Sequence, residues 1–151
     1  QPKNVRVPLG ASVQDLIAFC GGLTQTPKKM ITGGPMMGYA LWDPESPVVK
    51  STSGILLFSE AYDRINTLHS PCIHCGRCVA HCPMHLMPNY LAQYAMARDY
   101  DRAQEMDVMS CVECGTCSYN CPAGVEIVQY IRVAKGAIRA KAAALKAARQ
   151  A

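Results

Sequence analysis

The sequence predicts an α+β chain in which a small sheet comes first and a helical, cysteine-rich segment follows. Three observations support this fold class. Short apolar runs separated by Gly and Pro fill residues 1–58, apolar residues at helical spacing follow later, and two cysteine runs divide the helical part. The first pattern is typical of short strands and the second of helices. The 151-residue chain is half apolar and 17% charged, which is sufficient for a packed core.

Residues 1–58 are expected to form a small sheet that carries one helix. Ser12 stands three residues before Asp15, the spacing of a capping box, and the helical run VQDLIAFC ends at Gly21-Gly22. Strands are predicted at NVRVPLG, KKMIT, YALW, VVK and GILLF, with turns at GGPMMG and DPESP.

Residues 59–70 are interpreted as a polar linker, and the cysteine-rich domain is predicted at 71–123. Between the two cysteine runs, PNYLAQYAMA places Leu91, Tyr94 and Ala95 on one stripe. This spacing predicts a helix whose apolar stripe faces a core.

Residues 124–151 are Ala-rich and predict a C-terminal helix. The apolar residues expected near one face are Ile127, Ile131, Ala134, Ile138 and Leu145. The basic residues are Arg132, Lys135, Arg139, Lys141, Lys146 and Arg149. They are expected to form a solvated face, with docking on an acidic partner or an anionic lipid as the alternative.

Composition excludes several function classes. The net charge of +4 is too small to indicate nucleic acid as a partner. The densest apolar stretch is short, GILLF at 54–58, so no segment is expected to span a membrane. The chain starts at Gln1 without a charged-then-apolar leader, which we interpret as a piece of a longer protein.

The two cysteine runs, PCIHCGRCVAHCP and CVECGTCSYNCP, both fit C-x2-C-x2-C-x3-C-P, the spacing of bacterial ferredoxin-type 4Fe-4S sites. Three thiolates at this spacing let one loop cover three corners of a cubane whose irons prefer sulfur. A disulfide framework lacks a secretory signal and fits the spacing poorly. Zinc is the weaker alternative, because a structural zinc site does not need the third cysteine.

The fourth cysteine of each run, Cys82 or Cys121, stands directly before a proline. Proline is favoured at the start of a helix, so Pro83 and Pro122 are each expected to begin a helix that carries the fourth thiolate to the neighbouring cluster. The predicted ligands of cluster 1 are Cys72, Cys75, Cys78 and Cys121. Those of cluster 2 are Cys111, Cys114, Cys117 and Cys82. A local assignment, in which each run holds its own cluster, remains the alternative.

Other residues near the runs receive weaker assignments. Gly76 and Gly115 either bring backbone N–H groups to the sulfurs or supply a left-handed turn residue. Cys20 is expected to be a small buried apolar residue, and the Met pairs in MMG and MHLM are expected to pack. Four histidines are expected at the surface or beside the ligating cysteines, but not as ligands: His69, His74, His81 and His85. The residues expected to exclude water from the clusters are Ile73, Val79, Val112 and Val125.

The strings KKMITGGPMMGYAL, VVKSTSGILLF, CIHCGRCVAHCPM and CVECGTCSYNCP, followed by VQYIR, resemble the C subunit of the Rnf electron-transport complex. The resemblance implies a soluble-ligand-binding β-grasp (SLBB) domain, without its first strands, and then an all-helical two-cluster ferredoxin domain. It also implies that all eight motif cysteines are ligands.

The resemblance further implies a role in a membrane-bound, ion-translocating ferredoxin:NAD oxidoreductase. The chain would relay electrons between an upstream FMN and NADH site and other subunits, peripherally at the cytoplasmic face of the bacterial inner membrane. GGPMMG lacks the spacing of a nucleotide-binding glycine loop, so FMN and NADH are expected only outside this chain, and no catalytic residue is predicted here.

Two alternatives to this function remain open. One is a cobalamin reductase of bacterial microcompartments, which shares the domain plan. The other is a ligand-binding module, which would need an apolar or aromatic pocket. Trp42 and two phenylalanines offer little material for such a pocket.

Overall fold

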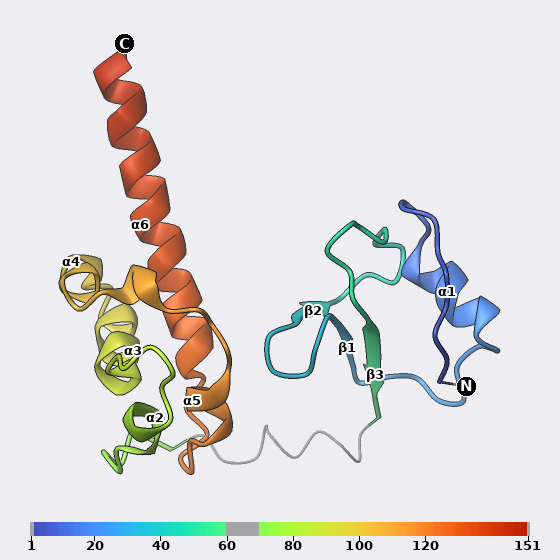
Figure 1. Cartoon of the computed structure of the whole chain (residues 1–151), viewed down its shortest axis with the longest axis horizontal. Coiled ribbons are helices and arrows are strands. Elements are labelled where there is room, and N and C mark those ends of the chain that lie inside the picture. The colour runs from blue at the N-terminus through green and yellow to red at the C-terminus, as the bar shows by residue number, and fades with distance from the viewer. Residues whose placement is uncertain (1, 60–69, 151) are drawn as a thin grey trace. The chain divides into compact units, whose positions relative to one another are not determined.

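The computed structural model describes residues 2–59 and 70–150 and divides into two compact units, residues 1–66 and 67–151 (Figure 1). The first unit contains a small antiparallel sheet and one helix, and the second contains helices. The predicted α+β class is confirmed at this level.

The sheet of the first unit has three strands in the order β2-β1-β3. Strand β1 (Lys29–Thr32) pairs antiparallel with β2 (Tyr39–Leu41) on one side and with β3 (Ile55–Phe58) on the other. The buried Ile31 of β1 lies opposite Ala40 and Leu56 in the two ladders. Three of the five predicted strands are therefore present.

The turn GGPMMG joins β1 to β2 and depends on its glycines. The Gly33 N–H donates to the Gly54 carbonyl at 2.8 Å with φ of 95°, a conformation that favours glycine. A Cβ on Gly38 would meet the Gly34 carbonyl oxygen at 2.5 Å and the Thr32 carbonyl oxygen at 2.6 Å. The motif thus allows two backbone segments to approach more closely than any side chain permits.

Helix α1 (Val13–Phe19) forms where the capping signals predict it. The Ser12 hydroxyl accepts from the Asp15 N–H at 3.0 Å. At the other end, the Gly21 and Gly22 N–H groups donate to carbonyls of the last turn, and both glycines have positive φ.

The strands predicted at NVRVPLG and VVK are wrong. In their place, Val48 accepts a backbone hydrogen bond from Gly10 and donates one to Ala11, and Ser12 forms an isolated bridge with Pro47. Pro8 and Pro47 lack the N–H that a longer ladder would need, so the pairing stays this short.

The second unit is built around two longer helices. Helix α3 (Pro88–Met96) packs against α6 (Ile127–Gln150), and α4 (Tyr100–Glu105) contacts both of them (Figure 1). A 3-10 turn at Val108–Ser110 leads into the second cysteine run. The buried core residues from these elements are Leu91, Ala92, Ala95, Ala103, Val108, Ile127, Val128, Ile131, Ala134 and Ile138.

Helix α6 has a buried first part and an exposed second part. Its apolar stripe is buried as predicted as far as Ile138, but Leu145 is 56% exposed. Figure 1 shows α6 extending beyond the other helices of its unit, which agrees with the exposure of its second part. Among the described residues, none of the helices is long and apolar enough to cross a membrane.

The prediction that Pro83 and Pro122 begin helices is wrong. Each proline instead occupies the second position of a β-turn, closed by hydrogen bonds from the His85 N–H to the Cys82 carbonyl and from the Gly124 N–H to the Cys121 carbonyl. Proline is favoured at this turn position because its φ is already fixed near the required value. The helices begin later, α3 at Pro88 and α6 at Ile127.

Candidate metal centres

The eight motif cysteines surround two separate cavities in the second unit. One cavity is lined by Cys72, Cys75, Cys78 and Cys121. The other is lined by Cys82, Cys111, Cys114 and Cys117. Each cavity therefore receives three cysteines from one run and the last cysteine of the other.

The two cysteine loops adopt the same backbone conformation. The residue before the second cysteine has positive φ in both, 53° at His74 and 55° at Glu113, and so does the glycine after it, 74° at Gly76 and 84° at Gly115. These left-handed residues curl each loop tightly, which supports the interpretation of both glycines as turn residues.

A short helix follows each glycine and buries the third cysteine. Helix α2 (Arg77–Ala80) contains Cys78, and α5 (Thr116–Tyr119) contains Cys117, with 8% and 7% of their surfaces exposed. The two short helices pack against each other. The chain leaving each helix consequently passes beside the other loop, and this crossing brings Cys82 and Cys121 to the opposite cavities.

Apolar side chains line most of the remaining wall of each cavity. Around the first are Ile73, Ala92, Met96, Val125 and Ile127. Around the second are Met84, Leu86, Leu91, Val112, Val128 and Ile131. Of the residues expected to exclude water, Ile73, Val112 and Val125 do line a cavity, although Ile73 and Val112 are more than half exposed; Val79 lines neither cavity.

Burial raises the pKa of the thiols of Cys78, Cys111 and Cys117, the last to about 11. The Thr116 hydroxyl, 3.4 Å from the sulfur of Cys114, lowers the pKa of that thiol. Since thiols bind metals as thiolates, binding a metal at these sites would displace protons from buried sulfur.

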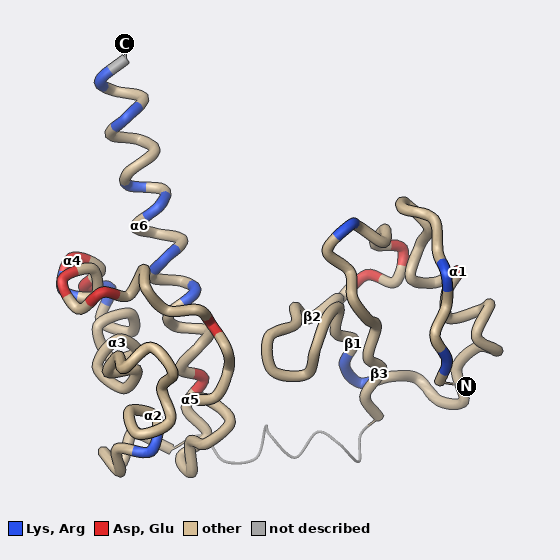
Figure 2. Tube along the Cα trace, in the orientation of Figure 1, with Lys and Arg blue, Asp and Glu red and all other residues tan. Residues whose placement is uncertain are grey.

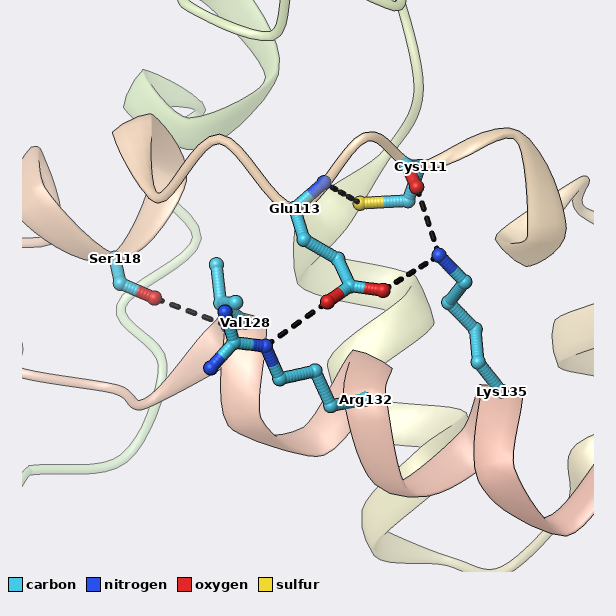
Figure 3. Close-up of polar contacts among 6 residues, drawn as sticks. All are labelled: Cys111, Glu113, Ser118, Val128, Arg132 and Lys135. Atoms are coloured by element: carbon cyan, nitrogen blue, oxygen red, sulfur yellow. Dashed lines mark hydrogen bonds and ion pairs between the residues drawn. The ribbon is translucent and has the colours of Figure 1, made fainter. Parts of the chain in front are cut away.

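An ion-pair network that the sequence analysis missed supports the second cysteine loop (Figure 3). The Lys135 Nζ donates to Glu113 Oε1 at 2.6 Å and to the Cys111 carbonyl at 2.9 Å, and the Arg132 Nε donates to Glu113 Oε2 at 2.9 Å. Burial acts to raise the pKa of Glu113, but its bonds to Lys135 and Arg132 outweigh burial and lower it.

This network corrects the expectation that all basic residues of the last helix face solvent. Lys135 is only 5% exposed, and Arg132 is also partly buried. Beyond them the expectation holds: Arg139, Lys141 and Lys146 are exposed, and Lys141 pairs with Asp101 at 2.6 Å. Figure 2 shows these basic residues along α6 and acidic residues at α4. The basic residues in the first part of α6 are covered by the second cysteine loop, whereas those in its second part are exposed.

Other predicted residues fall in several places. His74, His81 and His85 are exposed as expected, whereas His69 lies outside the described residues. Cys20 is half-buried rather than buried. The methionines predicted to pack are largely exposed, although Met84 also lines the second cavity: Met36, Met37, Met84 and Met87. Within residues 2–59 and 70–150, no group of three His, Cys, Asp or Glu side chains is placed to hold a single metal ion.

Family models match both units. Residues 64–137 match a 4Fe-4S dicluster domain, and residues 1–40 match an SLBB domain. The chain is 44% identical over 140 residues to the C subunit of the Na⁺-translocating ferredoxin:NAD⁺ oxidoreductase complex of Acetobacterium woodii. The chain belongs to the family of Rnf-type C subunits. The resemblance seen in the cysteine runs and in GGPMMG is thus confirmed.

Two further C subunits match most of this chain but only a part of their own length. The one from the proton-translocating ferredoxin:NAD⁺ oxidoreductase complex of Clostridium ljungdahlii is 46% identical over 141 residues, and the one from the ion-translocating oxidoreductase complex of Rhodobacter capsulatus is 46% identical over 136 residues. These matches cover 93% and 90% of the chain but 31% and 26% of the two relatives. The chain spans about a third or less of their length.

Proposed function

We propose that this chain holds two 4Fe-4S clusters and passes electrons between them as part of an ion-translocating ferredoxin:NAD oxidoreductase. The observation that carries the proposal is the pair of four-cysteine cavities. Cluster 1 would be held by Cys72, Cys75, Cys78 and Cys121. Cluster 2 would be held by Cys111, Cys114, Cys117 and Cys82.

The donor set of each cavity fits a cubane cluster. Four thiols surround a space with mostly apolar walls, and soft iron prefers sulfur ligands. Backbone N–H groups also point at ligand sulfurs: Glu113 N–H donates to Cys111 Sγ, and Val125 N–H to Cys121 Sγ, both at 3.4 Å. Such bonds stabilise negative charge on cluster sulfur.

One polar atom in the first cavity is consistent with the same interpretation. Asn89 lines this cavity, and its Oδ1 is buried without a hydrogen-bond partner among the described residues. The oxygen and nitrogen of an amide are interchangeable in assignment, so the NH2 group can take the position of Oδ1 and act as a donor there. A sulfur-bearing group in the cavity would then supply the missing partner.

The crossed assignment is favoured over the local one by the positions of the last cysteines. Cys82 lines the second cavity and is absent from the lining of the first, and Cys121 shows the reverse. A local assignment would require Cys82 and Cys121 each to leave the cavity that it lines.

In the complex, the chain would connect an FMN and NADH site elsewhere in the protein to other subunits. The names of the relatives state ferredoxin and NAD⁺ as reactants of their complexes. The 4Fe-4S clusters supply one-electron transfer when bound. The residues of this chain hold them and shield them from water, so no catalytic acid, base or nucleophile is required. The relatives' names favour this role over a cobalamin reductase.

For the domains, we assign residues 1–58 to a β-grasp SLBB-like domain lacking its first strands, 59–70 to a linker and 71–123 to the helical ferredoxin domain. We also assign residues 124–151 to the basic C-terminal helix, which the structure describes as α6 over Ile127–Gln150. The first part of this helix supplies core residues to the ferredoxin domain. The chain would associate peripherally with the cytoplasmic face of the membrane through partner subunits, without a span of its own.

Replacing Cys82 by Ser tests the proposal and the crossed assignment together. Anaerobically reconstituted protein should contain iron and acid-labile sulfide, and dithionite-reduced samples should show EPR signals of two clusters. The Cys82→Ser spectrum should resemble that of Cys114→Ser, because both residues line the second cavity, and Cys20→Ser should match the unsubstituted protein. A Cys82→Ser spectrum like that of Cys75→Ser would refute the crossing, and bound zinc without sulfide would refute the function.

A ligand-binding role for the first unit is a second candidate, and one observation favours it. A cavity of about 520 Å³, within the usual size range of ligand sites, lies between α1 and β3. Its walls include Leu16, Ile17, Cys20, Leu56 and Phe58. Saturable binding of an apolar fluorescent dye, unaffected by cluster removal, would support this role. Binding that disappears with the clusters would exclude it.

A further inference from the structure

The two cysteine loops form an internal repeat with unlike surroundings. At a constant offset along the chain, the motif cysteines and the prolines after them correspond, as do the positive-φ residues of the two loops and the starts of the helices that follow them. By this offset, Glu113 corresponds to His74, Arg132 to Gln93 and Lys135 to Met96. The backbone is repeated, but the charges near it are not.

Beside the second loop, two cations share one carboxylate. Lys135 and Arg132 both bond to Glu113, and Glu113 itself lines the second cavity (Figure 3). The three charges sum to one positive charge. Lys135 is the most buried of the three, and its ammonium group also bonds to the carbonyl of Cys111, a residue of the same cavity wall.

Beside the first loop, the corresponding positions cannot carry this charge. Gln93 and Met96 both line the first cavity, and neither side chain ionises. His74 is exposed to solvent, where screening weakens any charge that it carries. Arg77 also lines the first cavity, but it is exposed to solvent, so this cavity lacks a buried cation at the place where the second has one.

A fixed positive charge near a cluster favours its reduction. One-electron reduction of a four-thiolate 4Fe-4S cluster adds one negative charge, from about −2 to about −3. A buried ammonium stabilises that added charge more than an exposed one does, because the local dielectric is lower.

We infer that Lys135 is a positioning residue that raises the reduction potential of the cluster held by Cys82, Cys111, Cys114 and Cys117, so that the two clusters differ in potential. This inference rests on the proposed function. A difference of this kind would make the second cluster the preferred resting place of a single electron. A merely structural alternative is that Lys135 only fastens the loop through the Cys111 carbonyl.

Potentiometric EPR titration of the reconstituted 151-residue chain tests the inference. Lys135→Met removes the charge while keeping a long, unbranched side chain. It should lower the midpoint potential of the second cluster by about 59 mV. For a one-electron couple, this shift corresponds to about a tenfold change in the ratio of reduced to oxidised cluster. The first cluster should not shift, and Lys135→Arg should retain the original potential. The signal lost or altered in Cys82→Ser identifies the second cluster.

Glu113→Gln separates charge from structure. This variant removes the carboxylate but leaves the Lys135 bond to the Cys111 carbonyl available, so the potential of the same cluster should rise. If Lys135→Met fails to hold the second cluster, the direction in which Glu113→Gln shifts the reduction potential of that cluster tests the inference. An intact second cluster whose potential stays unchanged, or falls, in Glu113→Gln would overturn the inference. Absence of both clusters in the unsubstituted chain would instead overturn the proposed function.

Met96→Lys adds the charge at the corresponding position of the first cavity. Met96 is 45% exposed, so the new ammonium will be better hydrated than that of Lys135. A smaller rise, confined to the first cluster, is therefore expected. Equal movement of both clusters in these variants would contradict local control of each potential.

Discussion

The two units of this chain bury their apolar side chains to very different extents. Among the described residues, the first unit buries only Val13, Ile31 and Val48, and it exposes several large apolar side chains, with Trp42 at 92%. The second unit buries a continuous cluster drawn from α3, α4 and α6. The first unit therefore depends on backbone geometry in its turns, whereas the second depends on side-chain packing around the cysteine cavities.

This comparison predicts that core substitutions in the second unit have the largest effect. Ile131→Ala should destabilise the protein by about 2–5 kcal/mol, because Ile131 is fully buried and its loss leaves a cavity beside the second cysteine site. Denaturant unfolding followed by circular dichroism, with iron content measured in parallel, checks this.

Leu145→Ala is the matched control on the same helix. Leu145 is more than half exposed, so its replacement should change the free energy of unfolding by less than about 0.5 kcal/mol. Equal effects of the two substitutions would show that the second part of α6 is packed against something in solution.

Turn geometry in the first unit should give an intermediate effect. Gly38→Ala places a Cβ 2.5–2.6 Å from backbone oxygens of Gly34 and Thr32, which forces β1 and β2 apart at a cost of about 1–3 kcal/mol. Gly34→Ala is the control, because its added Cβ meets no atom within 4 Å.

The Gly38→Ala change should be visible as lost protection of the β1 and β2 amides in hydrogen exchange. Iron content should stay unchanged, since the substituted residue belongs to the unit without motif cysteines. Loss of iron in this variant would contradict the separation into two units.

The smallest effect is expected at the end of the chain. Removing the residues beyond Arg139 deletes only side chains that are exposed in the described part of the segment, and it breaks the exposed pair of Lys141 with Asp101, worth about 0–1 kcal/mol. Iron and sulfide content should not change. If the truncated protein loses iron, the boundary of the ferredoxin domain lies further along α6 than its buried residues indicate.

Local signals in the sequence predicted local structure well. The capping pair Ser12 and Asp15 and the glycines after α1 act on residues close in sequence, so their effect does not depend on distant contacts. The short apolar runs at β1, β2 and β3 also indicated strands, although the pairing of β1 with β3 joins residues far apart in the chain. The predictions at NVRVPLG and VVK failed because prolines limit how far those segments can pair.

The cysteine spacing by itself pointed to iron–sulfur chemistry, because three thiols on one short loop and a fourth beside a proline suit few other ligands. Together with GGPMMG, the same spacing indicated the likeness to a known family. Only tertiary structure decided that the prolines form β-turns, that packing of α2 on α5 gathers each set of four cysteines, and that Lys135 is buried against the second loop. Those features depend on contacts between residues far apart in the chain. A basic residue on a helix looks the same in sequence whether a neighbouring loop or water covers it.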